Sequence, residues 1–242
     1  MLGDISLDIP QGQLTAIIGP NGAGKSTLLN IMGNLDHKDL GEIYLDDISL
    51  DKWSRNDLAK RLSILKQKQH YDLKITVYEF IAFGRYPYSK GRLSDFDHEV
   101  IQEIIDFLEL HDLQDSYINT LSGGQLQRCA IAMVMAQDTE LILLDEPLNN
   151  LDIRQEIHLM NLLKRLVEKF NKQVVIIMHD INRVSQFADY IIALKNGCLF
   201  HQGRTQEVLQ CPILEELYDI GVDVIETQQH PLINFYEKEL LT

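Results

Sequence analysis

The stretch GPNGAGKST, residues 19–27, decides the fold of this 242-residue chain. It follows the apolar run Leu14–Ile18, which predicts a buried strand, and it opens a helix. Strand, glycine-rich loop and helix in this order are the setting of a phosphate-binding loop. Its glycines let backbone N–H groups surround a β-phosphate, Lys25 brings positive charge to the β- and γ-phosphates, and Ser26 offers its hydroxyl to Mg²⁺. The stretch predicts binding of ATP and Mg²⁺ through Gly19, Pro20, Asn21, Gly22, Ala23, Gly24, Lys25, Ser26 and Thr27.

The composition is that of an ordinary soluble protein, with 45% apolar and 24% charged residues. A net charge of −14 argues against general affinity for nucleic acid or anionic lipid, so no nucleic-acid partner is expected. The longest apolar runs are too short to cross a bilayer, and no signal peptide opens the chain. The three cysteines are scattered without metal-ligand spacing, which favours buried thiols in a reducing compartment.

The remaining patterns predict one α/β domain interrupted by a helical segment. The unbroken apolar runs 141–144 and 174–178 are typical of buried parallel strands, and the amphipathic stretch 154–170 between them predicts a helix. Other strands are expected at 5–9, 41–47 and 62–67, and a hairpin is expected at 189–203. The expected parts are a nucleotide-binding core (1–70 and 138–205), a helical subdomain (71–137) and an acidic, partly helical tail (206–242).

Two carboxylates end the buried strand in LILLDEP, residues 141–147. Asp145 can hold magnesium, directly or through water. Glu146 points elsewhere, because successive strand residues face opposite ways, and it can orient or deprotonate a water in line with the γ-phosphate. An Asp-Glu pair at a strand end is by itself an ordinary solvated edge; the phosphate-binding loop is what favours the catalytic interpretation.

Two further polar residues follow predicted strands. His179 ends the strand in VVIIMHD and is a candidate to contact the γ-phosphate and hold the attacking water, although a lone strand-end histidine is usually structural. Gln67, after LSIL, is a candidate contact to magnesium or water, with Gln69 close enough to compete for that role.

The stretch LSGGQ, residues 121–125, predicts an anion site at the start of a helix. Ser122 and Gln125 form a capping-box pattern, and the apolar run behind them reads as a buried helix. Gly123 and Gly124 leave bare N–H groups at the positive end of the helix dipole. The residues themselves do not say which anion this site meets.

The phosphate loop, a glutamine, LSGGQ, LILLDEP, LNNLD and a strand-end histidine, in this order, resemble the ATP-binding cassette of ABC transporters over nearly the whole chain. The resemblance implies a P-loop NTPase (RecA-like) α/β core with a mostly parallel sheet, a small antiparallel β subdomain and an inserted helical subdomain. It also implies an ATPase in which two cassettes, here expected to be identical, pack head to tail. Each signature helix, with Ser122, Gly123, Gly124 and Gln125, then faces the γ-phosphate held by the other copy, and Asp152 lies at the same junction.

A single cassette without membrane helices looks like the ATPase subunit of a bacterial importer, peripheral at the cytoplasmic face of the cell membrane. ITVYEFIAFGRYPYSKGRLSDFD, residues 75–97, resembles the iron–siderophore branch, which implies two transmembrane permease subunits and, indirectly, an extracytoplasmic siderophore-binding protein. Import of haem or vitamin B12, and a soluble cassette for iron–sulfur cluster assembly, remain alternatives. A phosphate-loop kinase or regulatory nucleotide binder would leave LSGGQ unexplained.

Two regions carry further expectations. The aromatic residues Tyr78, Phe80 and Phe83 are candidates for the core of the helical segment, whereas the polar stretch 85–92 is expected at the surface, where it would suit docking to a permease. The beginning of the chain departs from the family pattern, which usually has another strand and an aromatic residue that stacks on adenine. Either the start is truncated or misassigned, or adenine is held by other contacts.

Overall fold

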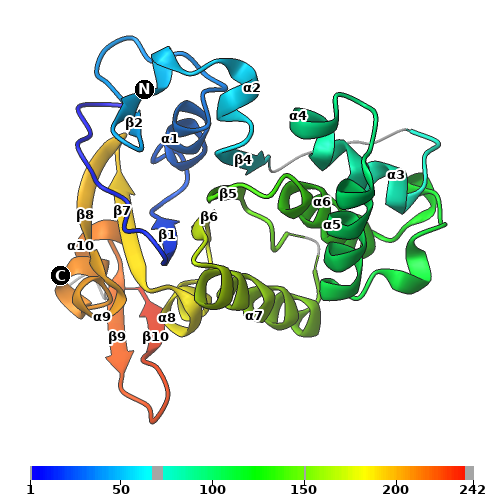
Figure 1. Cartoon of the computed structure of the whole chain (residues 1–242). Coiled ribbons are helices and arrows are strands. Elements are labelled where there is room, and N and C mark those ends of the chain that lie inside the picture. Colours follow the sequence, from blue (N-terminus) through cyan, green and yellow to red (C-terminus); the bar gives the residue numbers. More distant parts are fainter. Residues whose placement is uncertain (1, 67–72, 150, 238–242) are drawn as a thin grey trace, which may run out of the picture.

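The computed structural model describes residues 2–66, 73–149 and 151–237. Its centre is a six-stranded sheet (Figure 1). In spatial order the strands are β4 (Leu62–Leu65), β5 (Leu141–Asp145), β6 (Gln173–Ile177), β1 (Leu14–Ile18), β7 (Tyr190–Lys195) and β8 (Cys198–Arg204). The first five are parallel and β8 pairs antiparallel with β7, which confirms the mostly parallel α/β core.

Helices cover both faces of this sheet. The helices of the described residues are α1 (Lys25–Met32), α2 (Arg55–Leu58), α3 (Val77–Ala82), α4 (Tyr86–Ser89), α5 (Asp95–Phe107), α6 (Gly123–Ala136), α7 (Ile153–Phe170), α8 (Ile181–Phe187), α9 (Thr205–Val208) and α10 (Cys211–Tyr218). Short 3-10 turns lie at Leu50–Lys52, Phe83–Arg85, His111–Leu113 and Ile118–Thr120. Helices α3, α4, α5 and α6 gather on one side of the molecule (Figure 1), as expected for the inserted helical segment.

Alternation along each strand divides the core in two. In β1, Leu14, Ala16 and Ile18 belong to a large apolar cluster with buried residues of α6, α7 and α8. Ile17 points to the opposite face and joins a smaller cluster with residues of α1 and α2. Both faces of β1 are therefore buried, which explains why its sequence is apolar except for Thr15.

The expected strand at 5–9 is wrong. Both edges of β1 are already hydrogen-bonded, to β6 and to β7, so the residues before it cannot pair with it. Leu2, Ile5, Leu7 and Ile9 instead pack on the smaller apolar cluster. Their alternation reflects packing of one face on the core rather than strand pairing. Gly3 N donates to Gly197 O at 2.7 Å beside the β7–β8 turn.

The strand expected at 41–47 is much shorter than its pattern. Only β2 (Tyr44–Leu45) is regular, and it pairs antiparallel with β3 (Ile48–Ser49). Asp46 and Asp47 take φ angles of 51° and 60° and make the turn between them. Two left-handed residues in succession are typical of a type I′ hairpin turn, so these aspartates end the strand.

Arg85 is not at the surface as expected, because its guanidinium finds two buried partners. It is 2% exposed, and its Nε donates to Asp97 Oδ1 at 2.8 Å. A second nitrogen donates to Ala136 O, at the end of α6, at 2.9 Å, and the guanidinium lies 4.2 Å from the centre of the Tyr88 ring. This arginine ties α5 to the end of α6.

The aromatic residues of the helical segment divide differently from the expectation. Phe80 is buried in the large apolar cluster and Tyr78 is half-buried against it. Phe83 is 53% exposed, so its assignment to the core is wrong. It lies in the 3-10 turn after α3, where the chain bends toward α4.

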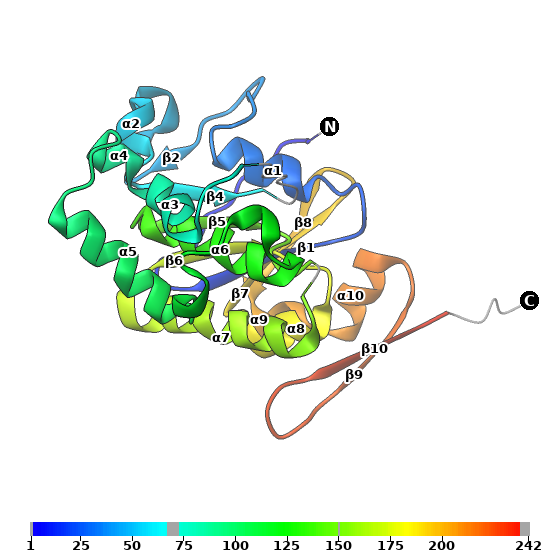
Figure 2. The ribbon, with the colours of Figure 1, turned by 90° about the vertical axis from the view of Figure 1, so that its right-hand side faces the viewer.

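The last part of the chain holds a further antiparallel hairpin that the sequence pattern did not reveal, β9 (Gly221–Ile225) and β10 (Leu232–Tyr236). Figures 1 and 2 show it reaching away from the main sheet beside α8 and α10. The Asn182 side chain in α8 donates to Ile233 O at 3.1 Å and accepts from Ile233 N at 2.8 Å. Ser185 donates to Pro231 O at 2.6 Å, so the hairpin is fixed to α8.

Candidate functional site

The site forms where three adjacent parallel strands, β5, β6 and β1, end at one edge of the sheet. Gly19 follows β1, Asp145 ends β5, and His179 lies two residues after β6. In open α/β sheets, ligands bind at the carboxyl ends of the strands. The sheet therefore brings together groups that are up to 160 residues apart in the chain (179 minus 19).

The loop between β1 and α1 is shaped for close approach by an anion. Gly24 caps α1 with a φ of 96°, a conformation that favours glycine. At Gly19 a Cβ atom would lie 2.1 Å from Leu194 O, so only a glycine fits beside β7. The N–H groups of the first turn of α1 consequently face the site without side-chain capping.

Lys25 is the first residue of α1, directly after this loop. Its Nζ donates to Gly19 O at 2.7 Å and to Pro20 O at 3.1 Å. Burial lowers the pKa of Lys25 from its ordinary value, and the nearby carboxylates of Glu146 and Asp145 partly oppose that shift. The ammonium group is thus held among loop carbonyls, at the point where phosphate oxygens would need a cation.

Asp145 and Ser26 present oxygen ligands side by side. Ser26 Oγ donates to Asp145 Oδ1 at 3.1 Å. Burial raises the pKa of Asp145, although the hydrogen bond from Ser26 opposes this rise. A buried carboxylate beside a hydroxyl is a donor set that suits Mg²⁺, which prefers oxygen ligands.

Glu146 turns out of β5 in a left-handed conformation, with a φ of 49°. Its Oε1 lies 2.5 Å from His179 Nε2, and its Oε2 accepts from Asn149 Nδ2 at 2.7 Å. The divergence of Glu146 from Asp145 was predicted from strand alternation, but the structure produces it by ending the strand at Asp145. The contact between Glu146 and His179 was not predicted, because the sequence does not show how far apart two strand ends lie.

A cavity of about 260 Å³ gathers eight of the predicted site residues. It is lined by Leu2, Asn21, Gly22, Gly24, Lys25, Ser26, Thr27, Glu146 and His179. Leu2 is the lining residue that the sequence analysis missed. Its side chain packs closely on Gly24, where an added Cβ atom would lie 2.5 Å from Leu2 Cδ2. The beginning of the chain therefore places an aliphatic side chain, rather than an aromatic ring, against the phosphate loop.

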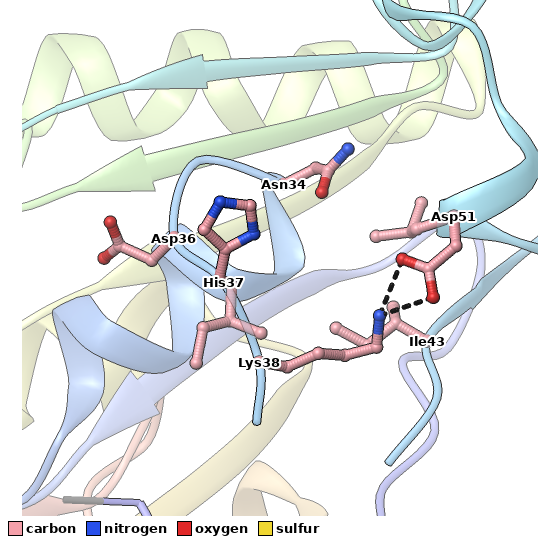
Figure 3. A pocket seen from close by; sticks show the side chains of 8 residues that line it. Asn34, Asp36, His37, Lys38, Ile43 and Asp51 are labelled. Atoms are coloured by element: carbon pink, nitrogen blue, oxygen red, sulfur yellow. Dashed lines mark hydrogen bonds and ion pairs between the residues drawn. The ribbon is translucent and has the colours of Figure 1, made fainter. Parts of the chain in front are cut away.

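A second cavity, of about 240 Å³, lies between the end of α1 and the small β2–β3 sheet (Figure 3). Lys38 Nζ crosses it and donates to both carboxylate oxygens of Asp51, at 2.7 and 2.8 Å. Asp36 and His37 also line it. None of the predicted site residues lines this cavity.

The residues of LSGGQ do not line the cavity of the phosphate loop. Ser122 caps α6 as predicted: its Oγ accepts from Gln125 N at 3.3 Å, and Gln125 Oε1 accepts from Ser122 N at 2.9 Å. Ser122 and Gly123 are both exposed, so the start of α6 is open to contact from outside the protomer. Asp152 caps α7 in the same way, with its Oδ1 accepting from Gln155 N at 2.8 Å.

Gln67 and Gln69 lie outside the described residues. Their predicted contacts to magnesium or water stay predictions.

The sequence and the fold of this chain are both similar to those of known proteins. The family model described as ABC transporter matches residues 2–149. The chain belongs to the ABC transporter family.

Curated relatives and solved structures extend this match over the cassette. The petrobactin import ATP-binding protein YclP of Bacillus subtilis is 48% identical, over 98% of this chain and 93% of its own length. The iron(3+)-hydroxamate import ATP-binding protein FhuC of the same species is 36% identical, over 99% and 92%. A dimeric bacterial ABC transporter cassette of known structure has a TM-score of 0.75 and 34% identity, over 84% of this chain and 90% of its own.

This ABC cassette is an ATP hydrolase. The same solved cassette is also known in a post-hydrolysis state bound to ADP and Pi, with the same TM-score of 0.75. In the part of this chain that the structure describes, no helix is both long and apolar enough to cross a membrane.

Proposed function

We propose that this ABC cassette energises import of an iron–siderophore complex, as the peripheral ATPase subunit of a membrane transporter. The observation that carries the proposal is sequence similarity over nearly the whole chain. The identity is 48% and 40% to two import ATP-binding proteins named for petrobactin, and 36% to one named for iron(3+)-hydroxamate. No residue of a cassette touches the transported substrate, so this support is by relationship. Haem or vitamin B12 is the second candidate cargo, and a soluble cassette serving iron–sulfur cluster assembly is the third reading.

Within the site, we assign the phosphates of ATP to residues 19–27. Backbone N–H groups of the loop and of the first turn of α1 bind them, and Lys25 exchanges its contacts with Gly19 O and Pro20 O for phosphate oxygens. Ser26 and Asp145 would hold Mg²⁺, and Gln67 is a further proposed ligand. When bound, Mg²⁺ neutralises charge on the β- and γ-phosphates.

Glu146 is the proposed general base. A water molecule attacks the γ-phosphorus, the bond from that phosphorus to the oxygen bridging to the β-phosphate breaks, and the water proton passes to the Glu146 carboxylate. The products are ADP and phosphate. His179, 2.5 Å from Glu146, fixes the direction of the carboxylate and is positioned to contact the γ-phosphate.

The start of α6 is proposed to serve the second protomer of a head-to-tail homodimer. Ser122, Gly123, Gly124 and Gln125 would cap the γ-phosphate held by the partner, with Asp152 at the same junction. Two observations support this: the capped helix end is open to the outside, and none of its residues lines the protomer's own cavity. A related cassette is a dimer.

Two permease subunits are the proposed membrane partners, reached from the cytoplasmic face, and a siderophore-binding protein acts outside the membrane without touching the cassette. Phe83, Tyr86 and Phe96 on the helical segment are 53%, 58% and 61% exposed. Exposed aromatic side chains are enriched at protein interfaces. These residues, rather than the buried Arg85, form the proposed permease-docking surface.

Replacing Lys25 with alanine is expected to weaken ATP binding roughly 10- to 100-fold, because hydrogen bonds to charged groups contribute about 1.5–3 kcal/mol each. Titration of a fluorescent ATP analogue measures the change. Lys52→Ala, which removes an exposed lysine far from the cavity lining, is the matched control. Equal affinity of the two variants for the ATP analogue would contradict the assignment of Lys25 to the phosphate-binding site.

Cells lacking this chain are expected to lose uptake of ⁵⁵Fe-labelled petrobactin or hydroxamate siderophore, and to regain it when the chain is restored. Parallel assays with haem and with vitamin B12 separate the second candidate cargo from the first. Restored uptake of haem or vitamin B12, with siderophore uptake unchanged throughout, would replace the proposed substrate. Unchanged uptake of all three would favour a non-transport cassette.

A further inference from the structure

The first turns of α6 and α7 lie against each other. Both helices begin with a capping box that has glutamine at the third helical position: Ser122 with Gln125, and Asp152 with Gln155. Gly124, in the first turn of α6, is buried, and a Cβ built on it would lie 2.5 Å from Gln155 Oε1 and 3.1 Å from Gln155 Cδ. The absence of a side chain at Gly124 is what makes room for the amide of Gln155.

The atom of Gln155 that approaches Gly124 also belongs to the cap of α7. Gln155 Oε1 accepts from Asp152 N at 3.4 Å, while Asp152 Oδ1 accepts from Gln155 N at 2.8 Å. An alanine at position 124 would move the far end of the Gln155 side chain and draw it away from Asp152. The absence of a side chain at Gly124 and the cap formed by Asp152 are therefore linked through the same side chain, that of Gln155.

A second contact joins α6 to the other end of the same loop. Gln127 Nε2, one turn into α6, donates to Pro147 O at 2.9 Å. Pro147 directly follows Glu146, whose Oε2 accepts from Asn149. The chain that leaves Glu146 and enters α7 is thus fixed to α6 near both its beginning and its end.

We propose that Gln127 and Gln155 are positioning residues that join the signature cap of a protomer to the loop carrying that protomer's own Glu146 and Asp152. The proposal rests on the proposed function, in which the cap of α6 meets the nucleotide of the partner. Contact of Ser122 with the partner's γ-phosphate then sets the position of Glu146 in the first protomer. The two sites are coupled through the contact of Gln155 with Gly124 and the hydrogen bond from Gln127 to Pro147 O. Gly124 is glycine because of Gln155, independently of the nucleotide.

The test uses the full chain carrying Glu146→Gln and measures the ATP concentration that gives half-maximal dimerisation, by size-exclusion chromatography with light scattering. Gln155→Ala and Gly124→Ala are each expected to raise that concentration roughly fivefold, the effect of losing one capping contact. Because both remove the same contact, the double variant is expected to be no worse than the more affected single variant. Multiplied effects in the double variant would show that Gly124 acts apart from Gln155 and would overturn the proposal.

Gln127→Ala is expected to raise the same concentration several-fold, whereas Gln206→Ala, which truncates an exposed glutamine of α9, leaves it unchanged. Binding of a fluorescent ATP analogue to the dilute monomer is expected to be unchanged in Gln127→Ala and Gln155→Ala, since neither glutamine lines the phosphate-loop cavity. A parallel loss of monomer binding would indicate general damage and overturn the positioning role.

Ser122→Ala in the same background separates the two levels of the argument. If it weakens dimerisation while the Gly124 and Gln155 effects multiply, the proposed cap stands and the positioning role fails. If it leaves dimerisation unchanged, the cap of α6 does not meet the partner's nucleotide and both proposals fail.

Discussion

Replacing Glu146 with glutamine should slow ATP hydrolysis by about 10²- to 10⁴-fold, the usual contribution of a general base. Glutamine keeps the shape of the side chain but cannot accept the proton of the attacking water. ATP binding should persist, because Lys25, Ser26 and Asp145 are unchanged. With the γ-phosphate intact, two protomers should stay closed around ATP, and the variant should elute as a dimer in ATP and Mg²⁺ while the wild type returns to monomer.

Phosphate release and size-exclusion chromatography measure the two halves of this result. Glu140→Gln is the matched control, because Glu140 pairs with Arg61 at the surface, away from the cavity. A Glu146→Gln variant that stays monomeric in ATP and keeps full turnover would contradict the assignment of the base.

The second large effect is on stability. Replacing Arg85 with methionine should lower the free energy of unfolding by about 3–5 kcal/mol, since removing one partner of a buried ion pair leaves the other charge uncompensated. Here the residue left behind is Asp97, 4% exposed. Urea unfolding at neutral pH measures the loss, and Arg92→Met, at an exposed position in the same stretch, is the control. A loss for Arg85→Met no larger than for Arg92→Met would contradict the pairing.

The pH dependence gives an independent check. Burial on its own would raise the pKa of Asp97, but hydrogen bonds from Ser94 and the Arg85 guanidinium outweigh it and hold that pKa below its ordinary value. A carboxyl with a lowered pKa in the folded state stabilises the protein above its unfolded pKa and loses this contribution as the pH falls through the folded pKa. The stability difference between wild type and Arg85→Met should therefore be full at neutral pH and shrink in acid.

The sequence predicts the parts of this protein in which local pattern and tertiary structure agree. Strands β1, β5 and β6 are mostly apolar because both their faces are buried, and an apolar run is visible without knowing the fold. The phosphate loop is equally visible, because its glycines and its lysine are fixed by local backbone geometry. The capping box at Ser122 formed as its spacing predicted.

Three features that the sequence did not predict share a physical cause: each depends on a partner outside the local pattern. The run 5–9 alternates like a strand, but whether it can pair depends on β6 and β7 occupying both edges of β1. Arg85 looks like a surface residue until Asp97 and Ala136 O are placed beside it. The contact of Gln155 with Gly124 leaves no trace in spacing, since it arises from the packing of two helix starts.

The alignment of β5, β6 and β1 has a consequence for how an ATPase of this type can move. Asp145, the loop at Gly19 and His179 are all carried on one hydrogen-bonded sheet, so their mutual distances are set when the protomer folds. In the proposed dimer, two protomers can come together and separate without any change in these distances. The movement between protomers can be large while the distances among the reacting groups within each protomer stay fixed.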